Sequence, residues 1–240
     1  MDASNLLIII PARGGSKGLP GKNVKMLGDF PLIKWTSDAV LHSGLVNHQC
    51  ILSTDDREIA EIGRNIGLHV PFIRPPELGD DTATAVSVID HAIKWFNAER
   101  NYQPEYLMLL QPTSPFRSPG VIHDAYSMLL ERDTEAVIGV KPIHRNLSTI
   151  FSTTEQENML PIDSQAKLVT RRQEVRTLYT PNGAMYATRC DTFSTQKTLF
   201  PKNNRGIILD KIQSHDIDDP MDWAIAESYV NSNLSWRSNL

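Results

Sequence analysis

Apolar residues follow two kinds of pattern along the first part of the chain. Short runs rich in apolar residues, typical of strands buried on both faces of a parallel sheet, occupy residues 6–10, 49–54, 70–73, 106–111 and 136–140. Between these runs, apolar residues recur at helical spacing over residues 32–41, 57–67, 86–96 and 121–130. Strands that alternate with helices predict an α/β fold with a mainly parallel sheet and right-handed crossovers.

This regularity ends near residue 141. Residues 141–180 are polar with short alternating pieces such as "STIFST", and long irregular segments in compact domains are often functional or pack against a partner. A surface excursion without a function fits the same pattern. Strands return at 183–189 and 206–210, and an acidic turn leads into a last helix with Pro220 in its first turn and Asp219 or Asp218 as its cap. We expect a single domain, 1–240, with an insertion at 141–180 that forms a hairpin extension.

Composition narrows the classes of function. The chain has 240 residues, 40% of them hydrophobic, and a formal charge of −4, which argues against a basic surface for nucleic acid. Cys50 and Cys190 form no C-x-x-C or histidine pattern, which fits a reducing compartment. The apolar run at 6–10 is too short for a signal peptide or a membrane span. We therefore expect a soluble, cytoplasmic protein without a nucleic-acid or membrane partner.

The stretch "IIIPARGGSKGLPGKN", residues 8–23, has the composition of a phosphate-binding loop. Its glycines free backbone N–H groups, and Arg13, Lys17 and Lys22 supply the positive charge that a triphosphate needs. It is not a P-loop, because Ser16 stands where the first glycine is required and Asn23 follows Lys22. No register gives G-x-G-x-x-G either. An exposed basic loop without a ligand is the alternative.

Three polar stretches follow predicted strands, where ligands of parallel sheets bind. They are residues 13–23, "STDD" at 53–56 and "QPTSPFR" at 111–117. Prolines on both sides of Thr113 and Ser114 fix an irregular backbone, so we expect Gln111 and Arg117 to face the same mouth as the phosphate loop.

The acidic stretch "HDIDD", residues 215–219, is a candidate metal site. Asp216 and Asp218 lie two apart, so in an extended segment both carboxylates point to one side and can bind one hard cation such as Mg²⁺. Helix capping and solubility are the alternative, which suits Asp219 and Asp222 better. The metal is favoured because the phosphate loop lacks its own Mg²⁺ ligand.

A basic cluster precedes the last predicted strands. Arg171, Arg172 and Arg176 lie shortly before Asn182 and Gly183, and one of these arginines could bind a ligand carboxylate with two hydrogen bonds. A surface basic cluster fits the spacing equally well.

Together these motifs resemble one family. "IIPARGGSKGLPGKN", "STDD", "RPPELGDDTAT", "LLQPTSPFR", "RRQ" before "NGAMY", and "DIDDPMDWAIAE" are similar, from residue 7 to about 230, to the acylneuraminate cytidylyltransferases, which make CMP-sialic acid and CMP-legionaminic acid. The resemblance implies a Rossmann-like nucleotide-diphospho-sugar transferase fold. It also implies that the anomeric hydroxyl of a nine-carbon acidic sugar attacks the α-phosphate of CTP, with release of pyrophosphate.

The resemblance also implies roles for residues at matching positions. Those expected to bind CTP are Arg13, Ser16, Lys17, Lys22, Asn23, Arg74, Thr82 and Thr84. Those expected to face the sugar are Gln111, Arg172, Asn182 and Tyr186, with Arg172 binding its carboxylate. Asp216 and Asp218 would bind Mg²⁺, and with Arg13, Lys17 and Lys22 they form the implied catalytic set. The insertion would build a homodimer and lend residues to the neighbouring site.

The identity of the sugar stays open. A basic residue that some members place in the insertion has no clear counterpart, although Arg145 and Leu147 are candidates. The phosphate loop looks more like the sialic and legionaminic branches than the pseudaminic or 3-deoxy-octulosonic ones. A sugar-1-phosphate nucleotidyltransferase and a noncatalytic nucleotide-binding module are the more distant alternatives.

Overall fold

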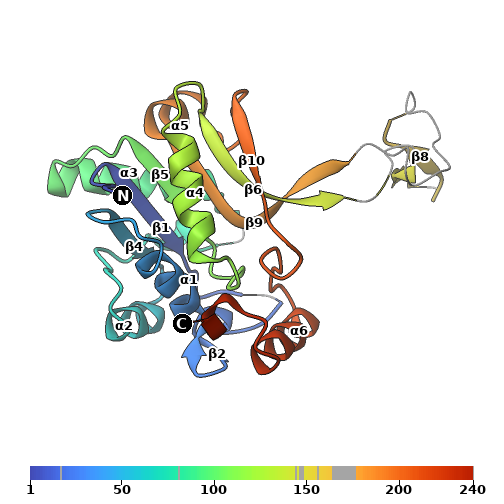
Figure 1. The fold of residues 1–240 in the computed structure, drawn as a ribbon, viewed down its shortest axis with the longest axis horizontal. Coiled ribbons are helices and arrows are strands. Elements are labelled where there is room, and N and C mark those ends of the chain that lie inside the picture. Colours follow the sequence, from blue (N-terminus) through green and yellow to red (C-terminus); the bar gives the residue numbers. More distant parts are fainter. Residues whose placement is uncertain are drawn as a thin grey trace.

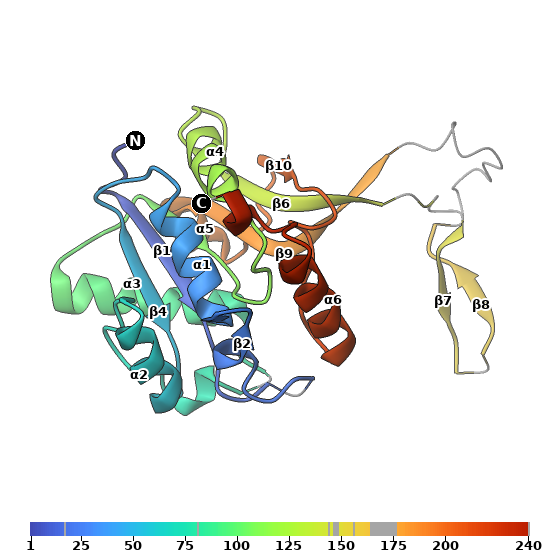
Figure 2. The same cartoon turned by 60° about the horizontal axis from the view of Figure 1, so that its bottom comes forward.

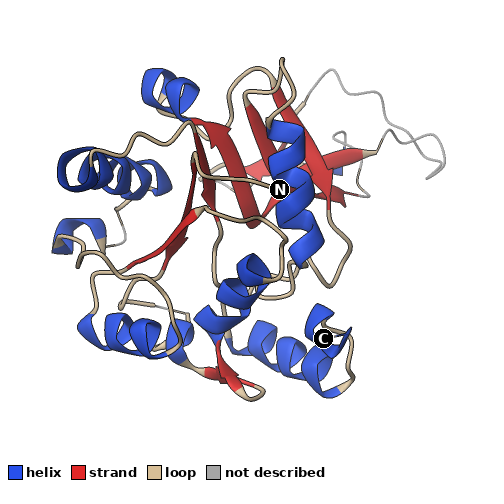
Figure 3. Cartoon of the chain, turned by 60° about the vertical axis from the view of Figure 1, so that its left-hand side comes forward, coloured by secondary structure: helices blue, strands red, loops and turns tan. Residues whose placement is uncertain are grey.

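A computed structural model describes residues 1–16, 18–80, 82–143, 145, 149–155, 157–163 and 177–239. Within these residues the central sheet has the strand order β10-β6-β9-β5-β1-β4. The strands are β1 (Leu6–Pro11), β4 (Gln49–Ser53), β5 (Tyr106–Leu109), β6 (Ala136–Ile143), β9 (Leu178–Arg189) and β10 (Asn204–Ile208). Figure 1 shows the sheet with its helices, and Figure 3 shows the same layers from another side.

The sheet is mainly parallel, as the alternation of strands and helices predicts. Strands β5, β1 and β4 are parallel to one another, and so are β10 and β6. Only β9, among the described strands of this sheet, runs antiparallel to both of its neighbours. The α/β fold class is therefore confirmed, with one reversed strand near its middle.

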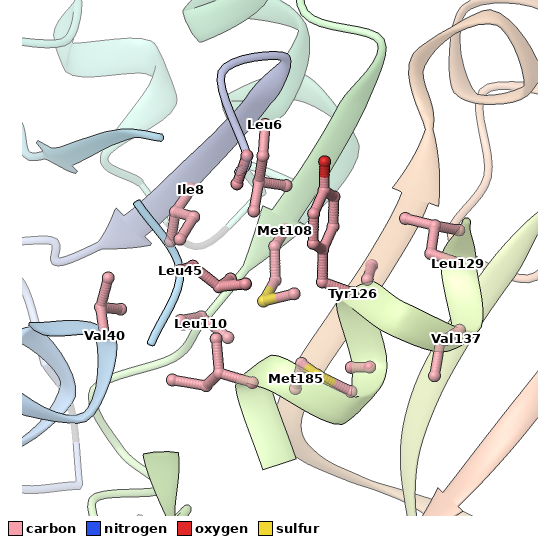
Figure 4. Close-up of a cluster of buried hydrophobic side chains, with 14 of the residues drawn as sticks. Leu6, Ile8, Val40, Leu45, Met108, Leu110, Tyr126, Leu129, Val137 and Met185 are labelled. Atoms are coloured by element: carbon pink, nitrogen blue, oxygen red, sulfur yellow. The ribbon is translucent and has the colours of Figure 1, made fainter. Parts of the chain in front are cut away.

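Helices cover both faces of the sheet. They are α1 (Leu32–Leu41), α2 (Arg57–Asn65), α3 (Ala85–Arg100), α4 (Pro119–Leu129), α5 (Cys190–Gln196) and α6 (Pro220–Asn231). Leu6 and Ile8 of β1 lie in one buried cluster with residues of α1 and α4, shown in Figure 4. Leu7 and Ile9 pack on the other face with α3 and α5. Each fully buried aliphatic side chain of this kind stabilises the fold by about 1.5–3 kcal/mol, so β1 anchors both layers.

Some predicted elements differ from the structure. Residues 70–73 form no strand and contribute only the isolated bridge Thr54–Ile73, because Pro71 has no N–H to donate to a ladder. The loop before α3 contains the short 3-10 helix η2 (Pro76–Leu78). Helix α5 and the small β2–β3 hairpin (Met26–Leu27, Phe30–Pro31) were not predicted.

The helices α2 and α6 both begin at an aspartate that caps their first turn. The carboxylate of Asp56 accepts the N–H groups of Glu58 and Ile59 at the start of α2. Asp219 caps α6 in a reciprocal arrangement with Asp222, as predicted for these two acids. These caps satisfy backbone donors that helix formation leaves unpaired.

An arm extends from the sheet within the predicted insertion. Strands β6 and β9 stay paired as far as Ile143 and Leu178. Beyond them, β7 (Phe151–Thr153) and β8 (Met159–Pro161) form a separate antiparallel hairpin that lies away from the body of the molecule in Figures 1 and 2. Residues 164–176, which include Arg171, Arg172 and Arg176, lie outside the described residues, as does Leu147. The division into domain and insertion stays a prediction.

Candidate active site

A cavity of about 340 Å³ opens beyond the carboxyl ends of β1 and β5, a size typical of small-molecule sites. It collects residues from four segments far apart in the sequence. Its lining includes Arg13, Ser16, Lys22 and Asn23 after β1; Arg74, Asp80 and Thr84 before α3; Gln111 and Thr113 after β5; and Asp216 and Asp218 before α6. The sequence predicts two of these segments, the phosphate loop and residues 111–117, at the mouth, and the structure brings all four together there.

The phosphate loop is held by its own backbone and by Asn23. Gly21 adopts a left-handed φ of 66°, which turns the chain into the 3-10 helix η1 (Lys22–Val24) and favours glycine there. Asn23 Nδ2 donates to the carbonyl oxygen of Arg13 at 3.0 Å, so it crosses the loop from its last residue to its first. Lys17 lies outside the described residues.

Asp216 and Asp218 both line the cavity, whereas Ile217 between them is fully buried beside Phe116 and Trp223. This alternation is the one expected of an extended segment. The hydroxyl of Ser114 donates to Asp216 Oδ1 at 3.4 Å. Burial raises the pKa of Asp216, and the negative charge of Asp218 adds to the shift, so the two carboxylates interact.

The phosphate loop and the acidic segment are in direct contact. The buried ammonium of Lys22 donates to the carbonyl oxygen of Ile217 and lies 3.3 Å from Asp218 Oδ1. At Gly18 a Cβ atom would overlap the carbonyl oxygen of Asp218. Cations that suit phosphate therefore adjoin carboxylates that suit a divalent cation.

Asp55, in the predicted stretch "STDD", joins two parts of the cavity. Its Oδ1 accepts the N–H of Gly14 at 3.3 Å and lies 3.2 Å from Arg74 NH2. Arg74 is only 3% exposed; burial lowers its pKa, and the hydrogen bond that it donates to Asp55 opposes this shift. Among the described residues no group bonds the buried Nε of Arg74. Sequence reasoning gave Asp55 no role, since its partners come from other segments.

The two threonines predicted to line the nucleotide side are placed differently. Thr84 lines the cavity and caps α3 in a reciprocal arrangement with Ser87. Thr82 is not part of the lining within the described residues; its hydroxyl donates to Asp80 Oδ1 at 2.7 Å. Through that bond Thr82 supports the turn whose carbonyl at Asp80 accepts Arg13 NH1 at 3.3 Å.

The residues predicted to face the sugar lie on strand β9, which approaches the cavity at Gly183, and in the loop after β5. This glycine has a φ of 80°, and a Cβ atom there would lie 3.1 Å from Gln111 Oε1 and 3.3 Å from Asp216 Oδ2. Asn182 is buried and its Nδ2 donates to Ser214 Oγ at 3.0 Å. Tyr186 packs edge-on against Phe200; burial raises the pKa of Tyr186, and the charge of Asp216 adds to the shift. Of the described residues predicted to face the sugar, only Gln111 lines the cavity.

Arg117 does not face the mouth, contrary to our expectation. Its side chain is fully buried and donates to the carbonyl oxygens of Gln111 at 3.0 Å and Ala184 at 2.9 Å. The guanidinium therefore satisfies one carbonyl group of the proline-interrupted loop and one of β9. Nothing in the spacing of "QPTSPFR" distinguishes this position from an open one.

The sequence from residue 7 to residue 221 matches the model of the cytidylyltransferase family. The chain belongs to this family. It is 33% identical over 230 residues to the CMP-N,N'-diacetyllegionaminic acid synthase of Legionella pneumophila, covering 95% of this chain and 97% of that protein. It is 32% identical over 213 residues to an N-acylneuraminate cytidylyltransferase of Streptococcus agalactiae, covering 88% of this chain and 50% of that protein.

Solved structures share the fold at low sequence identity. A CMP:2-keto-3-deoxy-manno-octonic acid synthetase complexed with CTP superposes with a TM-score of 0.69 at 15% identity, covering 95% of this chain and 99% of that one. The 4-diphosphocytidyl-2C-methyl-D-erythritol synthase of Anaerococcus prevotii gives 0.63 at 14% identity, covering 94% of this cytidylyltransferase and 98% of that chain. The nucleotidyltransferase fold and activity that the resemblance implies are confirmed. Within the described residues, no helix has the length and apolar character needed to cross a bilayer.

Proposed function

We propose that this cytidylyltransferase activates a nine-carbon acidic sugar, N-acylneuraminic or legionaminic acid, with CTP to give the CMP-sugar and pyrophosphate. The observation that carries the proposal is the contact between the phosphate loop and the acidic segment across one cavity, through Lys22, Ile217 and Asp218. Such a site suits a triphosphate together with its divalent cation. The similarity to enzymes named for these two sugars supports this substrate class.

The nucleotide would occupy the side of the cavity formed by the phosphate loop and Arg74. In this assignment the triphosphate is bound by Arg13, Ser16, Lys17, Lys22 and Asn23, and the cytidine by Arg74, Thr82 and Thr84. The buried Arg74 with an unbonded Nε is the strongest support on the cytidine side, since a buried donor without a partner is costly. A base carbonyl at this position would remove that cost.

Asp216 and Asp218 fit a bound Mg²⁺. They are carboxylates on one side of an extended segment, and each lines the cavity. No group of three or more such ligands occurs among the described residues, and Mg²⁺ commonly binds one or two carboxylates with substrate phosphates and waters. When bound, Mg²⁺ would supply charge neutralisation at the triphosphate.

The chain's own residues would act by positioning and by electrostatic stabilisation. In the proposed step the anomeric hydroxyl oxygen of the sugar forms a bond to the α-phosphorus and its proton passes to water. The bond from this phosphorus to the oxygen that bridges it to the β-phosphate breaks, so pyrophosphate leaves. Arg13, Lys17 and Lys22 would offset the charge on the phosphates, as in other phosphoryl transfers. Asn23 holds the loop in shape, which limits the reorganisation needed during the reaction.

The sugar would lie on the side of Gln111 and β9. Gln111 lines the cavity, Gly183 lets β9 approach Gln111 and Asp216, and Asn182 and Tyr186 flank this glycine. In this assignment Arg172 binds the sugar carboxylate bidentately.

We also propose a cytoplasmic homodimer built through the arm. The β7–β8 hairpin exposes Phe151, Met159 and Leu160, and a lone two-stranded hairpin is marginally stable in water. A partner chain would cover these side chains. Sedimentation of the full chain should give twice the mass of one chain, and Leu160→Asp should lower the measured mass toward that of a single chain. A monomeric parent protein would contradict the dimer. Both cysteines are free, which fits a reducing compartment.

Pyrophosphate release tests the proposed function. CTP and Mg²⁺ are incubated with N-acetylneuraminic acid, with diacetyllegionaminic acid or without sugar. Release that requires one of these sugars supports the proposal and identifies the branch. Release only with pseudaminic or 3-deoxy-octulosonic acid would replace the substrate class, and failure to bind CTP would remove the proposal.

A further inference from the structure

Arg117 is a buried cation without an acidic partner among the described residues. Its side chain has no exposed surface, and burial lowers its pKa to about 9, so the group is still charged at neutral pH. All of its hydrogen bonds described by the structure go to backbone carbonyl oxygens: Ala184 at 2.9 Å, Gln111 at 3.0 Å and Ser114 at 3.5 Å. A buried charge is costly unless such bonds compensate it.

These carbonyls belong to the two segments that frame the sugar side. Gln111 and Ser114 lie in the loop after β5, and Ala184 lies in β9 next to Gly183, which approaches Gln111 Oε1 and Asp216 Oδ2. The planar guanidinium therefore bridges the loop and the strand from inside the protein. A fork of several donors in fixed geometry suits this bridge better than a single ammonium.

The same loop holds the acidic segment. Ile217 N–H donates to the carbonyl oxygen of Thr113 at 2.9 Å. The hydroxyl of Ser114 donates to Asp216 Oδ1 at 3.4 Å, and the Thr113 side chain hydrogen-bonds the same carboxylate. A shift of residues 111–117 would therefore move Asp216 as well as Gln111.

We propose that Arg117 is a positioning residue that fixes Gln111 and Asp216 relative to β9, and so sets sugar and metal binding without touching either ligand. The inference rests on the proposed function, because it takes Gln111 and Asp216 as the groups to be positioned. It separates the two ends of the cavity: Arg74 and Asp55 contact none of the three carbonyls in the bonds described, so CTP affinity measured without Mg²⁺ is predicted not to depend on Arg117.

Arg189 provides a matched control. Its guanidinium also donates to backbone carbonyl oxygens, those of Thr134 at 2.9 Å and Glu131 at 3.5 Å, but at the far end of β9. Arg117→Met and Arg189→Met each remove a backbone-bracing guanidinium. Arg117→Lys keeps the charge but loses the fork.

The kinetic test measures kcat, the KM for the sugar and the Mg²⁺ concentration for half-maximal rate, and a separate titration without Mg²⁺ gives the Kd for CTP. In Arg117→Met the KM for the sugar and the half-maximal Mg²⁺ concentration should rise at least about tenfold, with CTP affinity changed less than about twofold. Arg117→Lys should recover part of this loss. Arg189→Met should lower only thermal stability. Equal kinetic effects in the two Met variants, or none in either, would overturn the inference.

Amide hydrogen exchange supplies a readout that needs no turnover. The exchange of the Ile217 amide should accelerate at least about tenfold in both Arg117 variants. The amide of Leu52 on β4, which donates to the carbonyl oxygen of His69, should exchange as in the parent protein. An unchanged Ile217 amide would contradict the positioning role even if no sugar is turned over. If Arg117→Met does not fold, Arg117→Lys decides both measurements. If the parent protein is inactive with every sugar and the Arg117 variants still show this exchange pattern, the proposed function is overturned. The positioning of residues 111–117 and Ile217 by Arg117 is then still supported.

Discussion

The ammonium of Lys22 lies 3.3 Å from the carboxylate of Asp218, although 196 residues separate them in the chain. The Lys22 side chain is 9% exposed and that of Asp218 is 76% exposed, so the lysine is fixed and the aspartate faces the cavity. A divalent cation that takes the Asp218 carboxylate would release a donor of Lys22 toward phosphate. Binding of CTP and of Mg²⁺ should therefore reinforce each other, which calorimetry of each ligand with and without the other can measure.

Asp218→Asn should abolish most turnover and leave the fold intact. We expect kcat/KM to fall at least about 100-fold, since a charged ligand at the phosphates is lost. The melting temperature should change little, because Asp218 is exposed and the buried Lys22 keeps its bond to the carbonyl oxygen of Ile217. Steady-state pyrophosphate release and thermal unfolding measure the two effects.

Asp219→Ala is the matched control for Asp218. Its carboxylate caps α6, so its removal should cost about 1 kcal/mol of folding free energy while the folded enzyme keeps its turnover. Full activity of Asp218→Asn at ordinary Mg²⁺ concentrations would show that the acidic segment is structural.

Gly18→Ala should push the phosphate loop away from the acidic segment. An added Cβ would overlap the carbonyl oxygen of Asp218, whereas at Gly15 nothing lies within 4 Å of it. We expect Gly18→Ala to destabilise the protein by about 1–3 kcal/mol and Gly15→Ala to change stability by less than about 0.5 kcal/mol. Urea denaturation of both variants checks this, and equal stability of the two would contradict the close contact.

Asp55→Ala should weaken CTP binding without affecting the sugar. Its carboxylate bonds both Gly14 and the buried Arg74, so its loss leaves a buried cation unpaired. We expect the Kd for CTP to rise about tenfold or more in Asp55→Ala. Asp55→Asn retains one acceptor oxygen, so its Kd should lie between those of the parent protein and Asp55→Ala. Calorimetric titration with CTP measures this; unchanged affinity in Asp55→Ala would remove Asp55 from the nucleotide site.

Stability should fall as the pH drops below 6.5. Burial lowers the pKa values of His48, His69 and His91 below the usual 6.5, and the charge of Arg74 adds to the effect at His91. The unfolded chain then binds more protons than the folded one below pH 6.5, so acid favours unfolding. Denaturant titrations at pH 7.5 and 5 should show the loss. It should be smaller in His91→Gln and undiminished in His123→Gln, which changes an exposed histidine; equal stability at both pH values would contradict the prediction.

The first half of the fold could be predicted because its signals are local. Helix α1 covers Leu32–Leu41, the range its apolar spacing predicts, and Gly67 ends the region of α2 with a φ of 88°. The direction of β9 could not be predicted, because it depends on the path of the insertion before it. Helix α5 was missed because Phe193 is its one large apolar side chain among polar ones.

Part of the site could also be predicted from local signals, and part depends on contacts between distant segments. The rule that ligands lie at strand ends placed the phosphate loop, "STDD" and Gln111 at one mouth. The cavity contains residues of the loop and Gln111, and Asp55 of "STDD" contacts Gly14 and Arg74 beside it. The buried position of the Arg117 side chain could not be predicted, because it depends on carbonyl groups of Gln111 and Ala184 that only the folded chain brings together. The same holds for Asn182, whose amide bonds Ser214.

The central claim is that the sugar's anomeric oxygen attacks the α-phosphorus of CTP in the cavity between Lys22 and Asp218. The most direct measurement uses freshly prepared N-acetylneuraminic or diacetyllegionaminic acid labelled with ¹⁸O at the anomeric position, with CTP and Mg²⁺, and follows the label by ³¹P resonance and mass. The account predicts CMP-sugar with ¹⁸O in the bridge to phosphorus and unlabelled pyrophosphate. A CMP-sugar without the bridging label, or pyrophosphate formed with CMP alone, would contradict it.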